Sequence, residues 1–189
     1  MKRASVITFL SLALFASSLY AQQSSAVMTI ESCQKFTGDF YQWYGALLQK
    51  ELHEDTSSYA IKHRPQLFSA ALLKLLRDDL KAAEKNPGEI VGLDFDPFVN
   101  SQDPMPRYSA RKAAIKSDSC MVEVFGTDPS HKKQWADRDP KKPDVTAELK
   151  FIEKKWVFVN FHYGSESGKD GENLIAILHT LQKERAKSH

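Results

Sequence analysis

The sequence predicts an α+β domain: two N-terminal helices, a curved antiparallel sheet of about four strands, and a C-terminal helix. Two observations predict this class. Apolar residues recur at helical spacing in the first half of the chain and alternate along four segments of the second half. Those four segments follow one another without helices between them, which favours antiparallel neighbours over a parallel sheet.

The first helix is expected over residues 31–51, because an apolar stripe repeats there at steps of four and three. The stripe consists of Phe36, Phe40, Trp43 and Leu47. Residues 52–64 are polar and are expected to connect this helix to a second one. The second helix begins near Pro65, a residue suited to a first helical turn, and stops at residues 86–88.

Four strands are expected over residues 108–115, 120–125, 145–151 and 156–163. The last segment is apolar at both alternating sets of positions, which predicts a central strand. A final helix is expected from about residue 172. The charged residues 184–189 are expected to form a frayed tail, so that residues 31–183 make up a single domain without an internal linker.

The first 21 residues read as an export signal. Lys2 and Arg3 precede an apolar run over residues 6–15, and Ala21 provides the small residue expected at a cleavage site. An uncleaved anchor is the alternative, but the run is short of the ~20 apolar residues that cross a bilayer. We therefore expect a flexible leader over residues 22–30 and a periplasmic or secreted bacterial protein without a stable membrane anchor.

The charge of the chain is nearly balanced, with 26 Lys and Arg against 24 Asp and Glu. Loss of Lys2 and Arg3 with the signal leaves 24 basic and 24 acidic residues. A balanced chain has no electrostatic attraction for nucleic acid, so a nucleic-acid partner is not expected.

The two cysteines, Cys33 and Cys120, permit only one intramolecular pairing. Cys33 shares the arc of Phe36 and Phe40, and Cys120 alternates with Val122 on one face of a predicted strand. Export would place both in an oxidising compartment, which favours a disulfide between helix and sheet. Two buried free thiols are the alternative.

Four segments together carry a family resemblance: FYQWY at 40–44, LLKLL at 72–76, DFDPFVNSQD at 94–103 and WVFVNFHY at 156–163. Their order and spacing resemble the domain-of-unknown-function 3828 family of bacterial exported proteins and lipoproteins, over about residues 33–182. The resemblance implies a cystatin-like or NTF2-like cone with a pocket at its wide end, in the cell envelope. It implies no activity and supplies no catalytic residue, and this chain lacks the lipid anchor of many relatives.

The segment 94–103 is the first candidate binding loop, because it concentrates polar side chains around one aromatic residue. The candidate residues are Asp94, Asp96, Phe98, Asn100, Gln102 and Asp103. Calcium prefers such oxygen ligands, but Phe98 stands at the fifth position and no glycine at the sixth, so the EF-hand pattern fails and no metal is expected. The alternative is structural: Asp96 caps a turn while Phe98 fills the core.

Two further candidate sites come from other segments. Trp135 and Arg138 lie in the long connection 126–143 and could anchor a protein interface. Asn160 and His162 share one face of a predicted strand and could line the mouth of a pocket.

No complete catalytic motif occurs in the sequence, and no cofactor is expected. The leading hypothesis is therefore an exported, non-enzymatic domain that binds a protein partner or small ligand in the cell envelope. Two alternatives stay open. One is a hydrolase or isomerase whose pocket combines His162 with an aspartate, on fold analogy alone. The other is an immunity protein that neutralises a toxin.

Overall fold

The computed structural model describes residues 28–85, 91–130, 139–164 and 172–187. The predicted signal peptide and most of the leader lie outside these residues, as do Trp135 and Arg138. The described elements, in chain order, are α1 (Ile30–Leu48), α2 (Thr56–His63), the 3₁₀ turn η1 (Pro65–Leu67), α3 (Ala70–Lys85), β1 (Arg107–Lys116), β2 (Ser119–Thr127), β3 (Val145–Ile152), β4 (Lys155–Tyr163) and α4 (Leu174–Lys187).

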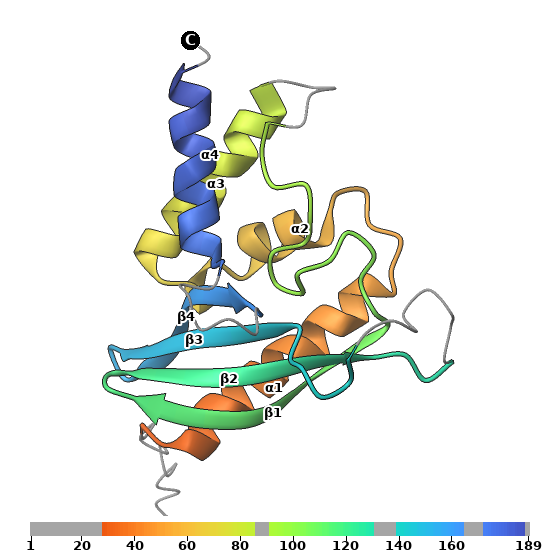
Figure 1. Cartoon of the computed structure of the whole chain (residues 1–189), viewed down its shortest axis with the longest axis vertical. Helices are drawn as coiled ribbons and strands as arrows, with labels where there is room; N and C mark the ends of the chain where they lie inside the picture. The colour runs from red at the N-terminus through yellow and green to blue at the C-terminus, as the bar shows by residue number, and fades with distance from the viewer. Residues whose placement is uncertain (1–27, 86–90, 131–138, 165–171, 188–189) are drawn as a thin grey trace, which may run out of the picture.

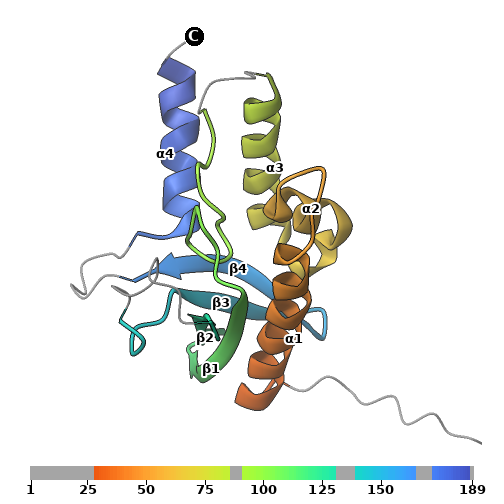
Figure 2. The ribbon, with the colours of Figure 1, turned by 90° about the vertical axis from the view of Figure 1, so that its right-hand side faces the viewer.

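The predicted α+β class is confirmed: in the described residues, four α-helices accompany one antiparallel sheet of order β1-β2-β3-β4, which does not close into a barrel. Helix α1 crosses one face of the sheet (Figure 1). Helices α3 and α4 contact each other and extend away from the sheet beyond β4 (Figures 1 and 2). Within the described part of the chain, no helix has the length and apolarity needed to cross a membrane.

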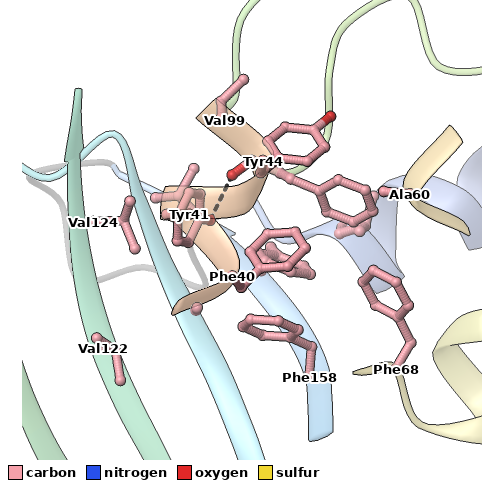
Figure 3. Close-up of a cluster of buried hydrophobic side chains, with 14 of the residues drawn as sticks. Phe40, Tyr41, Tyr44, Ala60, Phe68, Val99, Val122, Val124 and Phe158 are labelled. Carbon is pink, nitrogen blue, oxygen red and sulfur yellow. Dashed lines mark hydrogen bonds between the residues drawn. The ribbon is translucent and has the colours of Figure 1, made fainter. Parts of the chain in front are cut away.

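The core lies between α1 and the sheet, and aromatic side chains fill it. Phe40 stacks on Tyr44 with ring centroids 5.3 Å apart and meets Phe158 edge to face at 4.9 Å (Figure 3). Phe98 and Phe158 are fully buried beside them. The protein's own aromatic rings therefore occupy the space between α1 and the sheet.

Cys33 on α1 and Cys120 on β2 form a disulfide that closes a sequence separation of 87 residues. Both side chains are completely buried. The bridge attaches the first turn of α1 to the beginning of β2, an inner strand of the sheet. Near the same end of α1, the Trp156 side chain of β4 donates a hydrogen bond of 2.9 Å to the Ser32 hydroxyl. This bond attaches α1 to the edge strand β4.

Helix α2 forms where the sequence predicted a polar connector. The Asp55 carboxylate accepts hydrogen bonds from the backbone N–H groups of Ser57 and Ser58, each at 2.9 Å, and so caps the helix. Ala60 and Ile61 are buried against the rest of the protein. Eight residues give too few turns for an apolar period to be visible in the sequence.

Strand β4 is an edge strand and not the central strand that was predicted. The pairing of β3 with β4 shifts by one residue opposite Val159. Phe158 therefore faces the core, whereas Asn160 and His162 point to the other face. This shift explains the apolar residues at both alternating sets of positions, and it separates residues that strict alternation placed on one face.

The C-terminal segment is also more ordered than predicted. Helix α4 continues to Lys187, so residues 184–187 are helical rather than frayed. The side chain of Arg185 is only 19% exposed and makes an ion pair with α3.

Candidate functional site

A groove of about 790 Å³ lies where the C-terminal end of α1, α2 and α3 meet the segment 93–104. It is separate from the core between α1 and the sheet. Its volume falls within the range of ordinary ligand sites, which is about 300–1,000 Å³.

The groove combines an apolar surface with a concentration of negative charge. Its apolar lining comes from Leu48, Ile61, Leu76, Leu80, Ala83, Leu93, Phe95, Pro97 and Pro104. Its carboxylates are Asp55, Asp79, Glu84, Asp94, Asp96 and Asp103. Lysine, arginine and histidine are absent from the lining that the described residues provide.

Asp96 organises the turn that forms one wall of the groove. One carboxylate oxygen accepts the Phe98 backbone N–H at 2.9 Å, and the other accepts the Tyr44 hydroxyl at 2.7 Å. The Asp96 N–H donates to the Ser101 carbonyl at 3.0 Å. The turn closes through Asn100, whose φ of 51° lies in the left-handed region that asparagine tolerates. Asp96 therefore has the capping role that the structural alternative gave it.

Two more tyrosine hydroxyls fix the backbone of the same loop. Tyr41 of α1 donates to the Phe98 carbonyl at 2.6 Å, and Tyr163 of β4 donates to the Pro97 carbonyl at 2.8 Å. Burial raises the pKa of Tyr41 and of Tyr163, so both hydroxyls stay protonated and act as donors. The Phe98 side chain is fully buried and packs in the core against the rings of Phe40 and Phe68. The loop is thus held by α1 and β4 before any ligand arrives.

The Asp96 carboxyl has an unusual protonation equilibrium. Burial raises its pKa to about 6, while hydrogen bonds from Tyr44 and from the Phe98 N–H partly oppose that rise. The negative charge of Asp55 adds to the upward shift. The Asp96 carboxyl, which lines the groove, consequently changes charge near pH 6.

Four of the six predicted loop residues line the groove: Asp94, Asp96, Gln102 and Asp103. Gln102 donates to Asp94 at 3.3 Å, and the Asp103 N–H donates to the Ser101 hydroxyl at 3.0 Å. Phe98 instead enters the core, and Asn100 serves the turn. In the described residues, no three His, Cys, Asp or Glu side chains are grouped so that they could hold a metal ion.

Asp79 also lines the groove, and it was not among the residues predicted from the sequence. Its carboxylate accepts Arg185 at 2.7 Å through one oxygen and the Leu93 N–H at 3.0 Å through the other. Arg185 also donates to the Val91 carbonyl at 2.7 Å. Gly92 passes so close that a Cβ there would lie 2.9 Å from the Asp79 carboxylate. These contacts fix the start of the groove wall against α3 and α4.

A signal for Asp79 was present in the sequence. Asp79 follows Leu72 and Leu76 at helical spacing, which places a carboxylate on the apolar face of α3. A carboxylate in that position needs a buried partner. The identity of the partner, Arg185, depends on tertiary structure.

Asn160 and His162 lie away from the groove. His162 Nε2 is 2.9 Å from a Glu148 carboxylate oxygen, and the other oxygen of Glu148 accepts the Ser119 hydroxyl at 3.0 Å. Asn160 accepts the Ile175 N–H at 3.2 Å, at the start of α4. The structure does not bring His162 together with Asp96, because the shift in β4 turns His162 to the opposite face of the sheet.

No protein-family model and no curated protein matches this chain. Among solved structures, a chain of the selenomethionine form of the type VI effector–immunity complex Tae3-Tai3 from Ralstonia pickettii is similar, with 17% sequence identity and a TM-score of 0.47. That match covers 71% of this chain and 98% of the other. The native form of the same complex matches with 17% identity and a TM-score of 0.43, over 70% of this chain and 94% of the other.

Proposed function

We propose that this chain is an exported, non-enzymatic domain that binds a protein partner in the cell envelope through the groove beside α3. The observation that carries the proposal is the groove itself. It has a volume of about 790 Å³ and is lined by apolar and acidic side chains. Grooves that combine an apolar lining with a few convergent polar groups are the usual form of binding sites.

The loop that forms one wall of the groove is suited to binding because its conformation is already fixed. Hydroxyl groups of Tyr41, Tyr44 and Tyr163 hold its backbone and its capping aspartate. A site that is ordered in advance loses less conformational entropy when its partner binds. The loop residues that line the groove can therefore contact a partner without rearranging.

The proposed compartment is supported by the disulfide between Cys33 and Cys120, since disulfides persist mainly in oxidising environments. A signal peptide over residues 1–21 is the other support for export. Cleavage after Ala21 remains part of the proposal.

The alternative of a pocket enzyme has less support. Its proposed partners, His162 and Asp96, belong to different surfaces. Asp96 has the raised pKa expected of a general acid, but both of its oxygens are used within the turn. Glu148 lies between Ser119 and His162, whereas a serine nucleophile needs the histidine beside it.

An immunity protein that neutralises a toxin is a more specific form of the binding proposal. It also requires a preformed docking surface and no catalysis. Its additional requirement is that loss of this chain makes a cell sensitive to the bound partner. A deletion strain exposed to the purified partner tests that requirement separately from binding.

The groove can be tested by filling it. Ala83 is an exposed residue of α3 that lines the groove, so Ala83→Trp places a large ring there at a helix-propensity cost below about 0.7 kcal/mol. Ala71→Trp is the matched control, because Ala71 is exposed on the same helix but outside the groove.

Each variant, expressed in its native envelope, is cross-linked and purified, and its partner is identified and then titrated as a purified protein. We expect Ala83→Trp to weaken that interaction at least about tenfold and Ala71→Trp to leave it unchanged. Equal affinity for both variants would place the interface elsewhere.

A further inference from the structure

We infer that the segment of the partner that enters the groove is basic and apolar, with a Lys or Arg side chain next to an aliphatic or aromatic one. This inference rests on the proposed function, because it specifies the chemistry of the partner at the same groove. It makes a separate claim, since a groove could serve as an interface for a segment of any charge.

The first argument is the imbalance of charge inside the groove. Asp79 is neutralised by Arg185, at 2.7 Å. Four other carboxylates share the groove with no Lys, Arg or His of its described lining: Asp55, Glu84, Asp94 and Asp96. Hydrogen bonds from N–H and hydroxyl groups orient several of these carboxylates but do not remove their charge. A cationic side chain entering the groove would therefore gain attraction from several directions.

The negative field extends to the rim of the groove. Lys62 of α2 is an exposed residue that pairs with Glu54 at 2.6 Å. The hydrogen bond that Lys62 donates to Glu54 is the main cause that raises the pKa of Lys62, and Glu84 and Asp55 of the groove add to the rise. A cation that approaches this rim is thus already favoured by the groove carboxylates. An anionic segment would be repelled along the same path.

The second argument is the apolar surface that lies beside the charges. Leu76, Leu80 and Ala83 follow one side of α3, and Phe95 faces the same groove from the opposite wall. Burying an apolar side chain against such a surface contributes about 25 cal/mol per Å². A purely polar cation would leave this contribution unused. An apolar residue beside a basic one uses both parts of the groove.

The volume of the groove also favours a peptide segment over a lone ion. About 790 Å³ corresponds to a drug-sized ligand, and so to several side chains rather than one. The carboxylates of the groove come from three parts of the chain: the start of α2, the helix α3 and the segment 94–103. That distribution suits a segment with its charges separated along its length.

Three short peptides test the inference directly on the purified, oxidised full chain. All are acetylated and amidated heptapeptides in which leucine alternates with lysine, glutamine or glutamate. We expect the lysine peptide to bind about tenfold or more tightly than the glutamine peptide, and the glutamate peptide to bind weakest. Raising salt from about 50 to 300 mM should reduce the advantage of the lysine peptide, because screening weakens exposed charges.

A charge-removing variant shows where the lysine peptide binds. Glu84→Gln combined with Asp94→Asn removes two groove charges without changing side-chain size, and should abolish most of the lysine advantage. The matched control is Asp39→Asn combined with Asp118→Asn, which removes two exposed charges outside the groove. We expect the control to bind the lysine peptide like the parent chain.

The outcomes separate this inference from the proposed function. Equal affinities for the lysine and glutamine peptides, or no binding of the lysine peptide, overturn the inference. In that case a native partner that is lost with Ala83→Trp still supports the groove as an interface. If the lysine peptide binds as expected but Ala83→Trp leaves the native partner bound, the inference about groove chemistry holds and the proposed function fails. If the chain self-associates and the lysine peptide dissociates the oligomer, the partner is a second copy of the chain.

Discussion

Arg185 near the end of α4 lies 2.7 Å from Asp79 of α3, across 106 residues of sequence. Asp79 is 4% exposed, so this pair is nearly withdrawn from water. The same two side chains hold the backbone of Val91 and Leu93. This one ion pair therefore fixes the position of the C-terminal helix α4 and of the groove wall that begins at Leu93.

Replacing Arg185 should destabilise the protein strongly. Arg185→Ala leaves the Asp79 carboxylate buried with only the Leu93 N–H, and removing one partner of a buried pair costs about 3–5 kcal/mol. The free energy of unfolding from urea titration measures the loss. Lys183→Ala, an exposed substitution on the same helix, should change it by less than about 0.5 kcal/mol. Equal effects of the two substitutions would mean that the ion pair contributes nothing specific.

The role of Arg185 also marks a limit of prediction from sequence. Residues 184–189 are rich in charge, and a charged end is usually solvated, so a frayed tail was expected. The helix persists because one of its charges has a buried partner on a distant helix. Nothing local to residues 184–189 indicates that partner.

The parts of the fold that were predicted correctly depend on local periodicity. Each predicted strand lies within β1, β2, β3 or β4. The alternation of apolar and polar residues is clearest along β3, and the apolar run of β4 marks a strand without alternation. The edge position of β4 could not be predicted, since the one-residue shift opposite Val159 produces the same apolar pattern as a central strand. Helix α2 was missed because its stability comes from the Asp55 cap and from tertiary burial.

The candidate site was predicted only in its contiguous part. The segment 94–103 is a single stretch of chain, and four of its six candidate residues line the groove. The α2 and α3 residues that complete the groove approach this segment only after folding. For this reason, the sequence could suggest a binding loop but not the groove that surrounds it.

The stability of the protein should depend on pH through Asp96. Its pKa is raised from 3.8 in an unfolded chain to about 6, so the folded state binds the proton more tightly. Stability contributed by this group is therefore present below about pH 4 and is lost as pH rises through 6. A shift of two units corresponds to about 3 kcal/mol. Asp96→Asn should remove this pH-dependent part of the free energy of unfolding. Urea titrations of both proteins between pH 4 and 7 measure it.

The free energy of unfolding of Asp96→Asn should change in a defined direction relative to that of the parent chain. As pH rises from 4 to 7, the parent chain loses stability through Asp96, so the variant should become more stable relative to it. Asparagine stays neutral while it can keep one oxygen for the Phe98 N–H. A constant difference across this range would show that the folded and unfolded pKa values of Asp96 are equal.

The Tyr44 hydroxyl should hold the pKa of Asp96 down. Its hydrogen bond favours the carboxylate, so Tyr44→Phe should raise the pKa of Asp96 above about 6. The lost bond to a charged group should also lower the free energy of unfolding by about 2 kcal/mol at pH 7. Carbon-13 NMR titration of the Asp96 carboxyl measures the first effect.

Tyr59→Phe provides the matched control for that experiment. Tyr59 is half-buried and stacks on His63 with ring centroids 4.1 Å apart, and it is not among the residues that line the groove. Removing its hydroxyl should leave the Asp96 titration unchanged. A similar shift in both variants would point to a general loss of packing rather than to the Tyr44 hydrogen bond.

Reduction of the disulfide should lower stability substantially. The bridge between Cys33 and Cys120 closes 87 residues, and chain entropy in the unfolded state gives such a loop about 4–5 kcal/mol. Urea titration with and without a reductant measures this difference. In the variant with both cysteines replaced by alanine, reductant should have no effect, which separates the disulfide from other consequences of reduction.

Binding of the lysine peptide should weaken as Asp96 becomes protonated. Asp96 lines the groove, so a cation there favours its charged form and lowers its pKa below about 6. By linkage, affinity for the cation falls as pH decreases from 7 to 5. The other groups that interact electrostatically with Asp96 include Asp55, Tyr41, Tyr44 and Tyr163, and burial keeps these tyrosines protonated in that range. Calorimetry at several pH values should show the fall in the parent chain and a flatter profile in Asp96→Asn. Parallel profiles would mean that Asp96 serves only the turn and that other groove carboxylates bind the cation.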